Sequence, residues 1–498
     1  MFNLVRDPWI PVFRKGLMSL HDVFSAFGQL ESFDAPVLET ISLTRLLLCI
    51  ATAALRPKTE QDWKECRNRI VTESLAYLDK YQSKFDLRGA FLQTPWVPKI
   101  GNRTLSSLMV ACPSANSHLL FNHRTSIKWT EAQVALGLLT TQVFNSGGLL
   151  KSPVYTALGE EVHDEKIKDF SCGSPGSSTC VNILVTLIQG DTLLDTVHFN
   201  MIPENWVRQV PTMTLGKPVW EYGPFKTKGA EAQELSKSYL GNLVPLTRGI
   251  VIHEDDTVTM VGGAPVADYP EYREPMAAQY TIEKKQKKTS EFVDLYKRCS
   301  VSRAAWRDLE AILDLRQGPK GGIQLGAKGG VWALKHFIDS LSDHPKFTLL
   351  VGGFSCDKAK KEATPLWVYT LSAGMLNNDL LNLYAKFVGA TEKGARILYG
   401  AAAACLCKER GETGKRKVDK TLDMIRSRSA EIYWPQMEAL AMRVAQDLND
   451  QRYQSEVRNL VKSAFIQAVP QLRPDSVAAG LLYIASASEQ VEPQISMC

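Results

Sequence analysis

A change in sequence pattern near Leu371 constrains the fold of this chain more than any other feature. Before that point, segments typical of strands are interspersed with segments typical of helices, whereas the residues after it are nearly all of helical pattern. The helical segments are "LLNLYAKFVG", "GARILYGAAAACLCKE", "AEIYWPQMEALAMRVAQDL", "SEVRNLVKSAFIQAV" and "VAAGLLYIASA". The sequence therefore predicts an α+β protein with a large mixed α/β domain at residues 1–370 and a helical bundle at residues 371–498.

The first domain shows the periodicity of both helices and strands. Pro36 suits the first turn of a helix at about residues 36–55, and a second helix is expected at about residues 60–81. Apolar alternation on both sides of an acidic turn predicts a β-hairpin over residues 248–263. The segment "KFTLLVGG" predicts a strand that ends at the pair Gly352-Gly353, and a lysine-rich segment follows it.

The longest apolar run, "ISLTRLLLCIATAAL", is short for a membrane span and carries Arg45 near its middle. The N-terminal residues "MFNLVRDPWIPVF" lack the basic region and the long apolar core of a signal peptide. We therefore expect a soluble, cytoplasmic protein with no membrane association. The 10 cysteines are then expected to be reduced thiols.

Motifs for cofactors and catalysis are weak in this chain. The sequence contains no CxxC pair, so we expect no zinc site, and it lacks the GxxxxGK[ST] order of a P-loop and the GxSxG of a serine nucleophile. Two short groups keep a metal-dependent nuclease open as an alternative: His163-Asp164, which resembles half of a phosphohydrolase signature, and His253 to Asp256. The second group falls where a hairpin turn is expected, and consecutive acidic residues at a turn are usually solvated. A non-catalytic protein without a cofactor is therefore favoured.

Glycine- or serine-rich and basic loops interrupt the folded core. The net charge of +5 is only mildly basic, so the distribution of charge carries more information than its sum. The loops are residues 122–129, 172–178, 284–288 and 352–361. Glycines permit close approach of a ligand to the backbone, and lysines and arginines neutralise phosphate. Together the loops favour a protein that binds a polyanion.

Several short motifs occur in a specific order along the chain. They are "FNLVRDPWIPV", "LLFNH", "GDTLLDTV", "EPMAA" followed by "AAWRDLEAIL", and "LLVGGFSCDKAK". In this order they resemble the large subunit of Cascade, the type I-E CRISPR surveillance complex. The resemblance spans most of the chain and includes the late change to an all-helical pattern.

This resemblance implies a non-catalytic subunit whose C-terminal domain is a four-helix bundle. In that family the subunit lies at the 5′-handle end of the CRISPR RNA and recognises the protospacer-adjacent motif (PAM) of duplex DNA through the minor groove. It helps to open the duplex for R-loop formation, so that the guide RNA pairs with the target strand, and it recruits the helicase–nuclease. The implied partners are the CRISPR RNA, double-stranded target DNA, the backbone, small and 5′-handle-binding subunits of Cascade, and the helicase–nuclease.

The resemblance also assigns contacts to particular residues. The loop that reaches toward the RNA handle and a neighbouring backbone subunit corresponds to Asn122, His123, Arg124 and Lys128. The implied PAM and DNA contacts are Gly173, Ser174 and Gly176 in a glycine-rich loop, Gly352 and Gly353 at the base of a wedge, and Asp357, Lys358 and Ala359 at its tip. Additional basic contacts are expected from Lys284, Lys285, Lys287, Lys288, Lys360 and Lys361.

The wedge departs from the family pattern, in which an Asn-Gln-Ala triplet is common. An ionised Asp357 can only accept hydrogen bonds, whereas an asparagine can also donate to the acceptors that an A·T pair shows in the minor groove. Lys358 is a point charge that suits a phosphate better than a displaced base pair. We therefore predict that the PAM preference of this protein differs from that of Asn-Gln-Ala members.

A helical-bundle adaptor that only docks partners is a further alternative. It would show no duplex binding even within a complex, and it would be insensitive to charge reversal at Lys358 or Arg124.

Overall fold

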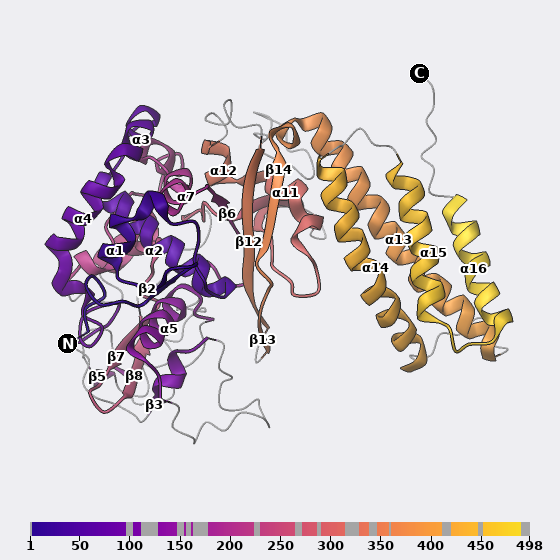
Figure 1. The fold of residues 1–498 in the computed structure, drawn as a ribbon, viewed down its shortest axis with the longest axis horizontal. Coiled ribbons are helices and arrows are strands. Elements are labelled where there is room, and N and C mark those ends of the chain that lie inside the picture. Colours follow the sequence, from indigo (N-terminus) through magenta and orange to yellow (C-terminus); the bar gives the residue numbers. More distant parts are fainter. Residues whose placement is uncertain are drawn as a thin grey trace. The chain divides into compact units, whose positions relative to one another are not determined.

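The fold is seen in a computed structural model (Figure 1). It describes residues 2–95, 103–110, 128–146, 154–155, 161–162, 178–223, 230–263, 271–285, 290–313, 328–337, 346–357, 360–410, 420–446 and 452–489. Contacts between residues divide the chain into unit 1, Met1–Arg303 with Leu315–Thr370, and unit 2, Ala304–Asp314 with Leu371–Cys498. The predicted α+β class is confirmed, because strands and helices mix in unit 1 and the described part of unit 2 is helical.

Unit 1 contains most of the described elements. In chain order they are β1 (Ile10–Val12), β2 (Gly16–Met18), α1 (Leu20–Ser25), α2 (Val37–Leu55), α3 (Glu60–Cys66), α4 (Ile70–Tyr81), β3 (Arg103–Thr104), the 3₁₀ turn η4 (Leu105–Leu108), α5 (Glu131–Val143), β4 (Val154–Tyr155), β5 (Glu161–Val162), β6 (Leu184–Gln189), α7 (Leu193–Asn200), α8 (Glu204–Val207), α9 (Ala230–Lys237), α10 (Tyr239–Leu243), β7 (Arg248–Ile252), β8 (Thr257–Gly262), β9 (Ala278–Lys285), β10 (Ser290–Tyr296), β11 (Lys328–Val331), α12 (Trp332–Phe337), β12 (Lys346–Asp357), β13 (Lys360–Ala363) and β14 (Trp367–Ser372).

Helix α2 is the central helix of unit 1. It starts directly after Pro36, as predicted, and its chain direction changes at Arg56, which adopts a left-handed conformation with φ of 47°. Among the described residues it is the one helix long and apolar enough to cross a membrane, but 89% of its most apolar window is buried inside the structure. Such burial is typical of a core helix, and it places the charged Arg45 side chain in the interior.

The predicted helix over residues 60–81 is interrupted in the structure. Residues 67–69 form a 3₁₀ turn between α3 and α4. Arg67 in this turn is held by the carboxylate of Asp195, with 2.7 Å between Nη2 and Oδ1. Trp63 before the turn and Ile70 and Leu78 after it are all buried.

Short antiparallel sheets organise unit 1. Strand β12 is the longest described strand and pairs with β13 and β14, and its residues Thr348 to Gly353 also pair with β6. The predicted hairpin over residues 248–263 is present as β7 and β8, with β3 on the other edge of β8. Strands β9, β10 and β11 form a separate three-stranded sheet.

Unit 2 is the predicted C-terminal bundle. Its helices are α13 (Asn378–Arg410), α14 (Lys420–Gln446), α15 (Tyr453–Ala468) and α16 (Pro474–Glu489). The segment of residues 304–314, which the sequence pattern assigned to the first domain, belongs to this unit as η6 (Ala305–Asp308) and α11 (Leu309–Leu313). It is held there because Tyr384 donates to the Trp306 carbonyl at 3.0 Å and the Arg307 guanidinium lies 3.8 Å from the centre of the Trp434 ring.

Two buried histidines of unit 1 pack on one tryptophan. His198 is stacked on Trp63 with ring centres 4.4 Å apart, and His336 meets the same ring edge-on at 4.6 Å. Among the described residues, His198 Nδ1 and His336 Nε2 have no hydrogen-bond partner. Burial lowers the pKa of both rings, that of His336 to about 3 with a further contribution from the neighbouring His198. Both rings are therefore held in the neutral form.

We expect this pair to make unit 1 sensitive to acid. The unfolded chain takes up protons near the ordinary histidine pKa, whereas the folded chain does so only at lower pH. For His336 the free energy of unfolding should therefore fall as the pH drops from about 6.5 toward 3, by up to about 1.4 kcal/mol per pH unit, and His198 should act in the same direction. Chemical unfolding between pH 7.5 and 4.5 measures this slope. His336→Gln should reduce it and His21→Gln, on the surface of α1, should not; equal slopes for wild type and His336→Gln would contradict the assignment.

Candidate nucleic-acid interface

The last four residues of β12 form an antiparallel ribbon with β13, beyond the part of β12 that pairs with β6. Residues Thr348 to Gly353 pair with β6, and Phe354 to Asp357 pair with β13 in the register Phe354↔Ala363 through Asp357↔Lys360. At about 3.4 Å per residue, the paired part of the ribbon is roughly 10 Å long. Figure 1 shows β13 at the far end of the long β12 strand. The lysine-rich segment is thus one arm of a hairpin rooted in the core of unit 1.

The prediction that the strand ends at Gly352-Gly353 is wrong, because β12 continues through both residues. Both glycines are buried. A Cβ on Gly353 would lie 2.5 Å from the Ile183 carbonyl oxygen and 2.8 Å from Cys299 Cβ, and one on Gly352 would clash with Val37 of α2. Because glycine has no Cβ, β12 can pass close to these neighbours. The two glycines therefore position the root of the hairpin, and in this structure their backbone is not presented to a ligand.

Of the predicted tip residues, the structure describes Asp357, the last residue of β12. Asp357 and Lys360 are paired across the two strands, so that Lys358 and Ala359 are the two residues between them. Lys358 and Ala359 themselves lie outside the described residues. Lys361 is in β13, opposite Cys356.

The segment that follows the predicted glycine-rich loop is attached to the same ribbon. Gly173, Ser174 and Gly176 lie outside the described residues, which resume at Ser178. Four residues later Asn182, in a left-handed conformation with φ of 63°, donates its backbone N–H to the Phe354 carbonyl at 2.8 Å.

The Asn182 side chain adds a second bond to the ribbon. Its Oδ1 accepts from the backbone N–H of Cys356 at 2.6 Å. Asparagine tolerates left-handed backbone better than most residues, which accounts for its use at this position. The structure thus brings the segment that follows one predicted DNA-contacting loop beside the ribbon that carries the other predicted contacts.

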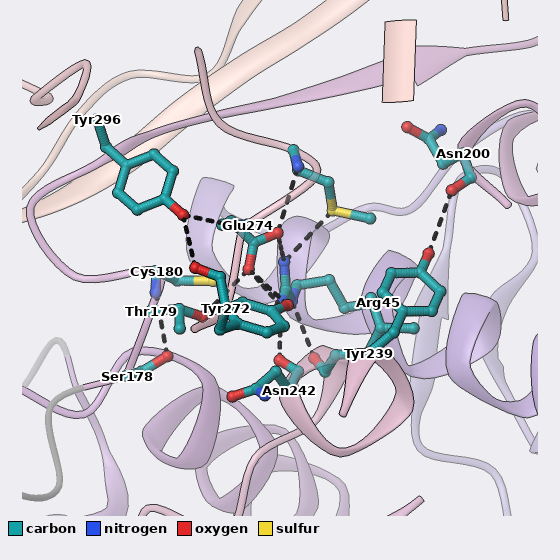
Figure 2. Close-up of polar contacts among 12 residues, drawn as sticks. Arg45, Ser178, Thr179, Cys180, Asn200, Tyr239, Asn242, Tyr272, Glu274 and Tyr296 are labelled. Atoms are coloured by element: carbon teal, nitrogen blue, oxygen red, sulfur yellow. Dashed lines mark hydrogen bonds and ion pairs between the residues drawn. The ribbon is translucent and has the colours of Figure 1, made fainter. Parts of the chain in front are cut away.

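A buried ion pair lies behind this junction. Arg45 Nη1 and Glu274 Oε1 are 2.9 Å apart, and neither side chain is exposed. Arg45 also donates to the carbonyls of Leu243 at 2.9 Å and Asn242 at 2.7 Å (Figure 2). Although burial opposes the charge, neighbouring groups that include Glu274 keep the pKa of Arg45 above its ordinary value. The arginine therefore stays protonated in the core.

The carboxylate of Glu274 extends this network to the candidate interface. It accepts from Thr179 Oγ1 at 3.1 Å and from the Tyr272 hydroxyl at 3.4 Å, as Figure 2 shows. Thr179 lies in the short segment between the glycine-rich loop and Asn182. The ion pair thus fixes, through Thr179, the segment that joins this loop to the β12–β13 ribbon.

The predicted RNA-handle loop is described only at its C-terminal end. Asn122, His123 and Arg124 lie outside the described residues, and Lys128 is exposed directly before Trp129. The Trp129 indole N–H donates to Ser106 Oγ of η4 at 3.2 Å. This bond holds Trp129, and the backbone of Lys128 beside it, next to η4.

The basic run at residues 284–288 connects β9 and β10. Lys285 is paired with Ser290 and Lys284 with Glu291, whereas Lys287 and Lys288 lie outside the described residues. The structure describes no contact between this run and the β12–β13 ribbon. Its role as an additional basic site stays a prediction.

The residues of the alternative metal site at His253 to Asp256 are engaged in the turn between β7 and β8. His253 Nε2 lies 2.8 Å from Thr259 Oγ1, and Asp256 pairs with Arg88 at 2.8 Å. Within the described ranges, no group of three or more His, Cys, Asp or Glu side chains could hold a metal ion. The other candidate, His163-Asp164, lies outside the described residues.

The chain was compared with known proteins. The family model of CRISPR-associated protein Cse1 matches residues 3–472. The CasA/Cse1 protein of Thermus thermophilus is 28% identical over 401 residues, which cover 75% of this chain and 72% of that protein. The solved structure of Thermobifida fusca Cse1 is similar with a TM-score of 0.76 at 20% identity, covering 98% of both chains. A chain of a CRISPR RNA-guided surveillance complex is similar with a TM-score of 0.68 at 15% identity, covering 98% of this chain and 99% of that one.

Proposed function

Because the chain belongs to the CRISPR-associated protein Cse1 family, the large subunits of type I-E Cascade, we propose that it is the PAM-reading subunit of an RNA-guided surveillance complex. Its partners are the CRISPR RNA, double-stranded target DNA and the other Cascade subunits. The chain itself is non-catalytic and needs no cofactor. It recognises the PAM through the minor groove and helps to open the duplex beside it.

One observation carries the proposal: the segment that follows the glycine-rich loop is bonded to the β12–β13 ribbon. Asn182 bonds to both Phe354 and Cys356, so this segment and the ribbon are held in a fixed relation. A narrow ribbon on a packed sheet suits insertion beside a base pair, since it resists bending when the duplex is forced apart. Recruitment of the helicase–nuclease is proposed from family membership alone.

The chemistry of the ribbon tip supports reading of the minor groove by hydrogen bonds. A G·C pair offers one donor there, the guanine amino group, and an A·T pair offers only acceptors. Asp357 can accept from the guanine amino group, and Lys358 can donate to a base edge or to a phosphate. We therefore propose that Asp357 and Lys358 set a PAM preference different from that of Asn-Gln-Ala relatives.

The test is to assemble the complex with and without this chain and to measure DNA binding. Without the chain, binding to duplex that carries a PAM should fall by at least about a thousandfold, to the non-specific level. Complementary single-stranded DNA needs neither PAM recognition nor duplex opening, so its binding should persist. Equal duplex binding with and without the chain would overturn the proposal. Metal-dependent cleavage of DNA by the isolated chain, lost in His253→Ala or His163→Ala, would favour the nuclease alternative.

A further inference from the structure

A short basic segment, residues 297–303, lies beside the β12–β13 ribbon in unit 1. It follows β10 directly and contains three basic residues and no acidic one. Arg298 of this segment forms an antiparallel bridge with Ile183, the residue after Asn182. The backbone N–H of Cys299 donates to the Asn182 carbonyl at 3.3 Å. Asn182 therefore bonds to the basic segment on one side and to the ribbon on the other.

The basic segment and the ribbon run in the same direction. Strand β6 is antiparallel to β12, and Arg298 is antiparallel to the residue directly before β6. Two antiparallel pairings in succession make the outer strands parallel, so the basic segment runs toward the same end of the sheet as the ribbon. Only one strand lies between the two, and neighbouring strands are about 4.8 Å apart, so they are separated by about 10 Å at this junction.

The side chain of Arg298 projects from this segment into solvent. Its neighbour Cys299 is buried against β12, since a Cβ on Gly353 would lie 2.8 Å from Cys299 Cβ. Successive side chains of an extended strand point to opposite faces, which turns Arg298 outward, and it is exposed. Other exposed arginines of unit 1 pair with carboxylates: Arg6 with Asp79, Arg67 with Asp195, Arg69 with Glu73 and Arg208 with Glu204. Within the described ranges, Arg298 has no such partner.

Two serines beside Arg298 add hydroxyl groups. Ser300 Oγ and Ser302 Oγ are 3.0 Å apart, so one hydroxyl donates to the other. The hydroxyl that accepts keeps its own hydrogen, which is available as a donor. Val301 between them is 41% exposed, so this turn is open to solvent. An unpaired guanidinium and a hydroxyl donor on a segment without acidic residues favour an oxyanion as the ligand.

The neighbouring ribbon indicates which polyanion supplies this oxyanion. The minor groove is only about 6 Å wide, so a ribbon that reads base edges there has a sugar-phosphate backbone on each side. Arg298 is on a segment that runs the same way as the ribbon and lies about 10 Å from it, which is too far for the same base edges and suits a flanking backbone. Contacts to phosphate position a protein on the duplex and carry no sequence information.

We infer that Arg298, together with Ser300 and Ser302, binds a backbone phosphate of the target duplex beside the PAM. The inference rests on the proposed function and adds to it a contact outside the predicted loops. The guanidinium offers paired N–H donors to two phosphate oxygens and stays charged, and a serine hydroxyl donates to a phosphate oxygen as well. This contact holds the duplex in place while the ribbon meets the base pairs.

The test measures binding of the assembled complex to PAM-containing duplex at increasing salt. Arg298→Gln should weaken binding on the order of tenfold, and the slope of log affinity against log salt should become shallower by about 0.9, the value for one contact to duplex DNA. Arg298→Lys should keep the slope. Ser300→Ala with Ser302→Ala should weaken binding about two- to tenfold at an unchanged slope. Arg69→Gln removes the same charge from the exposed turn before α4 and should leave affinity and slope unchanged.

A second arm identifies the phosphate. Neutral methylphosphonate linkages are placed one at a time beside the PAM of the duplex or in the 5′ handle of the CRISPR RNA. One linkage in the duplex should weaken binding by the wild type but have little further effect on Arg298→Gln. The same behaviour for a linkage in the RNA instead of the duplex would overturn the inference, as would a wild-type slope for Arg298→Gln.

The PAM bases selected by the complex separate a phosphate contact from a base contact. Arg298→Gln should select the same bases as the wild type, and a changed preference would overturn the assignment to a phosphate. If Arg298→Gln behaves as the wild type while the complex still needs this chain to bind PAM-containing duplex, the inference fails and the proposed function stands. If the wild-type complex binds this duplex equally well without the chain, the proposed function fails and the inference with it.

Discussion

Glu274→Gln is expected to destabilise unit 1 by about 3–5 kcal/mol, because it removes one partner of a fully buried ion pair. The substitution keeps the shape of the side chain but leaves the Arg45 charge without its counter-ion in the core. It also weakens the bond from Thr179, so the segment that leads to Asn182 should loosen. Chemical unfolding followed by tryptophan fluorescence measures the loss of stability.

Two further variants test whether the loss of stability comes from the buried ion pair. Asp79→Asn removes one partner of the exposed pair between Arg6 and Asp79, which are 47% and 56% exposed, and should change stability by less than about 1 kcal/mol. Arg45→Met combined with Glu274→Met removes both charges, and it should cost clearly less than the sum of the single losses. Additive losses, or a Glu274→Gln effect as small as that of Asp79→Asn, would show that the pair does not anchor the core.

The sequence predicted the elements whose pattern is local. The helix over residues 36–55, the hairpin over 248–263 and the C-terminal bundle all follow from periodicity, and the structure contains them. The predicted domain boundary is the change of pattern near Leu371, so the segment at residues 304–314 falls in the first predicted domain. Its place in unit 2 depends on contacts of Trp306 and Arg307 with helices about 80 or more residues away, which no local pattern reveals.

In the candidate site too, a local sequence pattern reveals some features, whereas contacts between residues far apart in the sequence determine the others. Arg45 in an apolar helix was visible as an anomaly, and a buried charge needs a partner, but nothing in the sequence indicated Glu274, 229 residues away. Gly352-Gly353 was interpreted as the end of a strand because glycine punctuates structure. The interpretation failed because these glycines are needed for close packing against α2 and Cys299. Asn182 was missed, since its bonds to Phe354 and Cys356 join segments that are far apart in the sequence.

The second large effect is expected at the tip of the β12–β13 ribbon. Asp357→Asn with Lys358→Gln restores the side chains common in the family and leaves the net charge unchanged, so bulk electrostatics cannot explain a difference. An asparagine gains a donor for A·T edges, and the glutamine loses the point charge that suits a phosphate. Each good contact to a base edge discriminates by about 1–3 kcal/mol, so preference for individual PAM bases should change roughly five- to 150-fold.

The matched control for this variant is on α4. Asp79→Asn with Lys80→Gln makes the same two chemical changes at adjacent exposed residues of unit 1. It should leave DNA recognition as it is in the wild type. Any change common to both double variants would then reflect a general effect on the chain.

The claim that this ribbon reads the PAM is tested most directly by a binding selection from a library of duplexes with randomised bases beside a constant target. The assembled complex is used with the wild type, with Asp357→Asn/Lys358→Gln and with Asp79→Asn/Lys80→Gln. The account predicts that the ribbon variant enriches a different set of flanking bases, while the α4 variant enriches the wild-type set. The same enriched bases for all three proteins would contradict it.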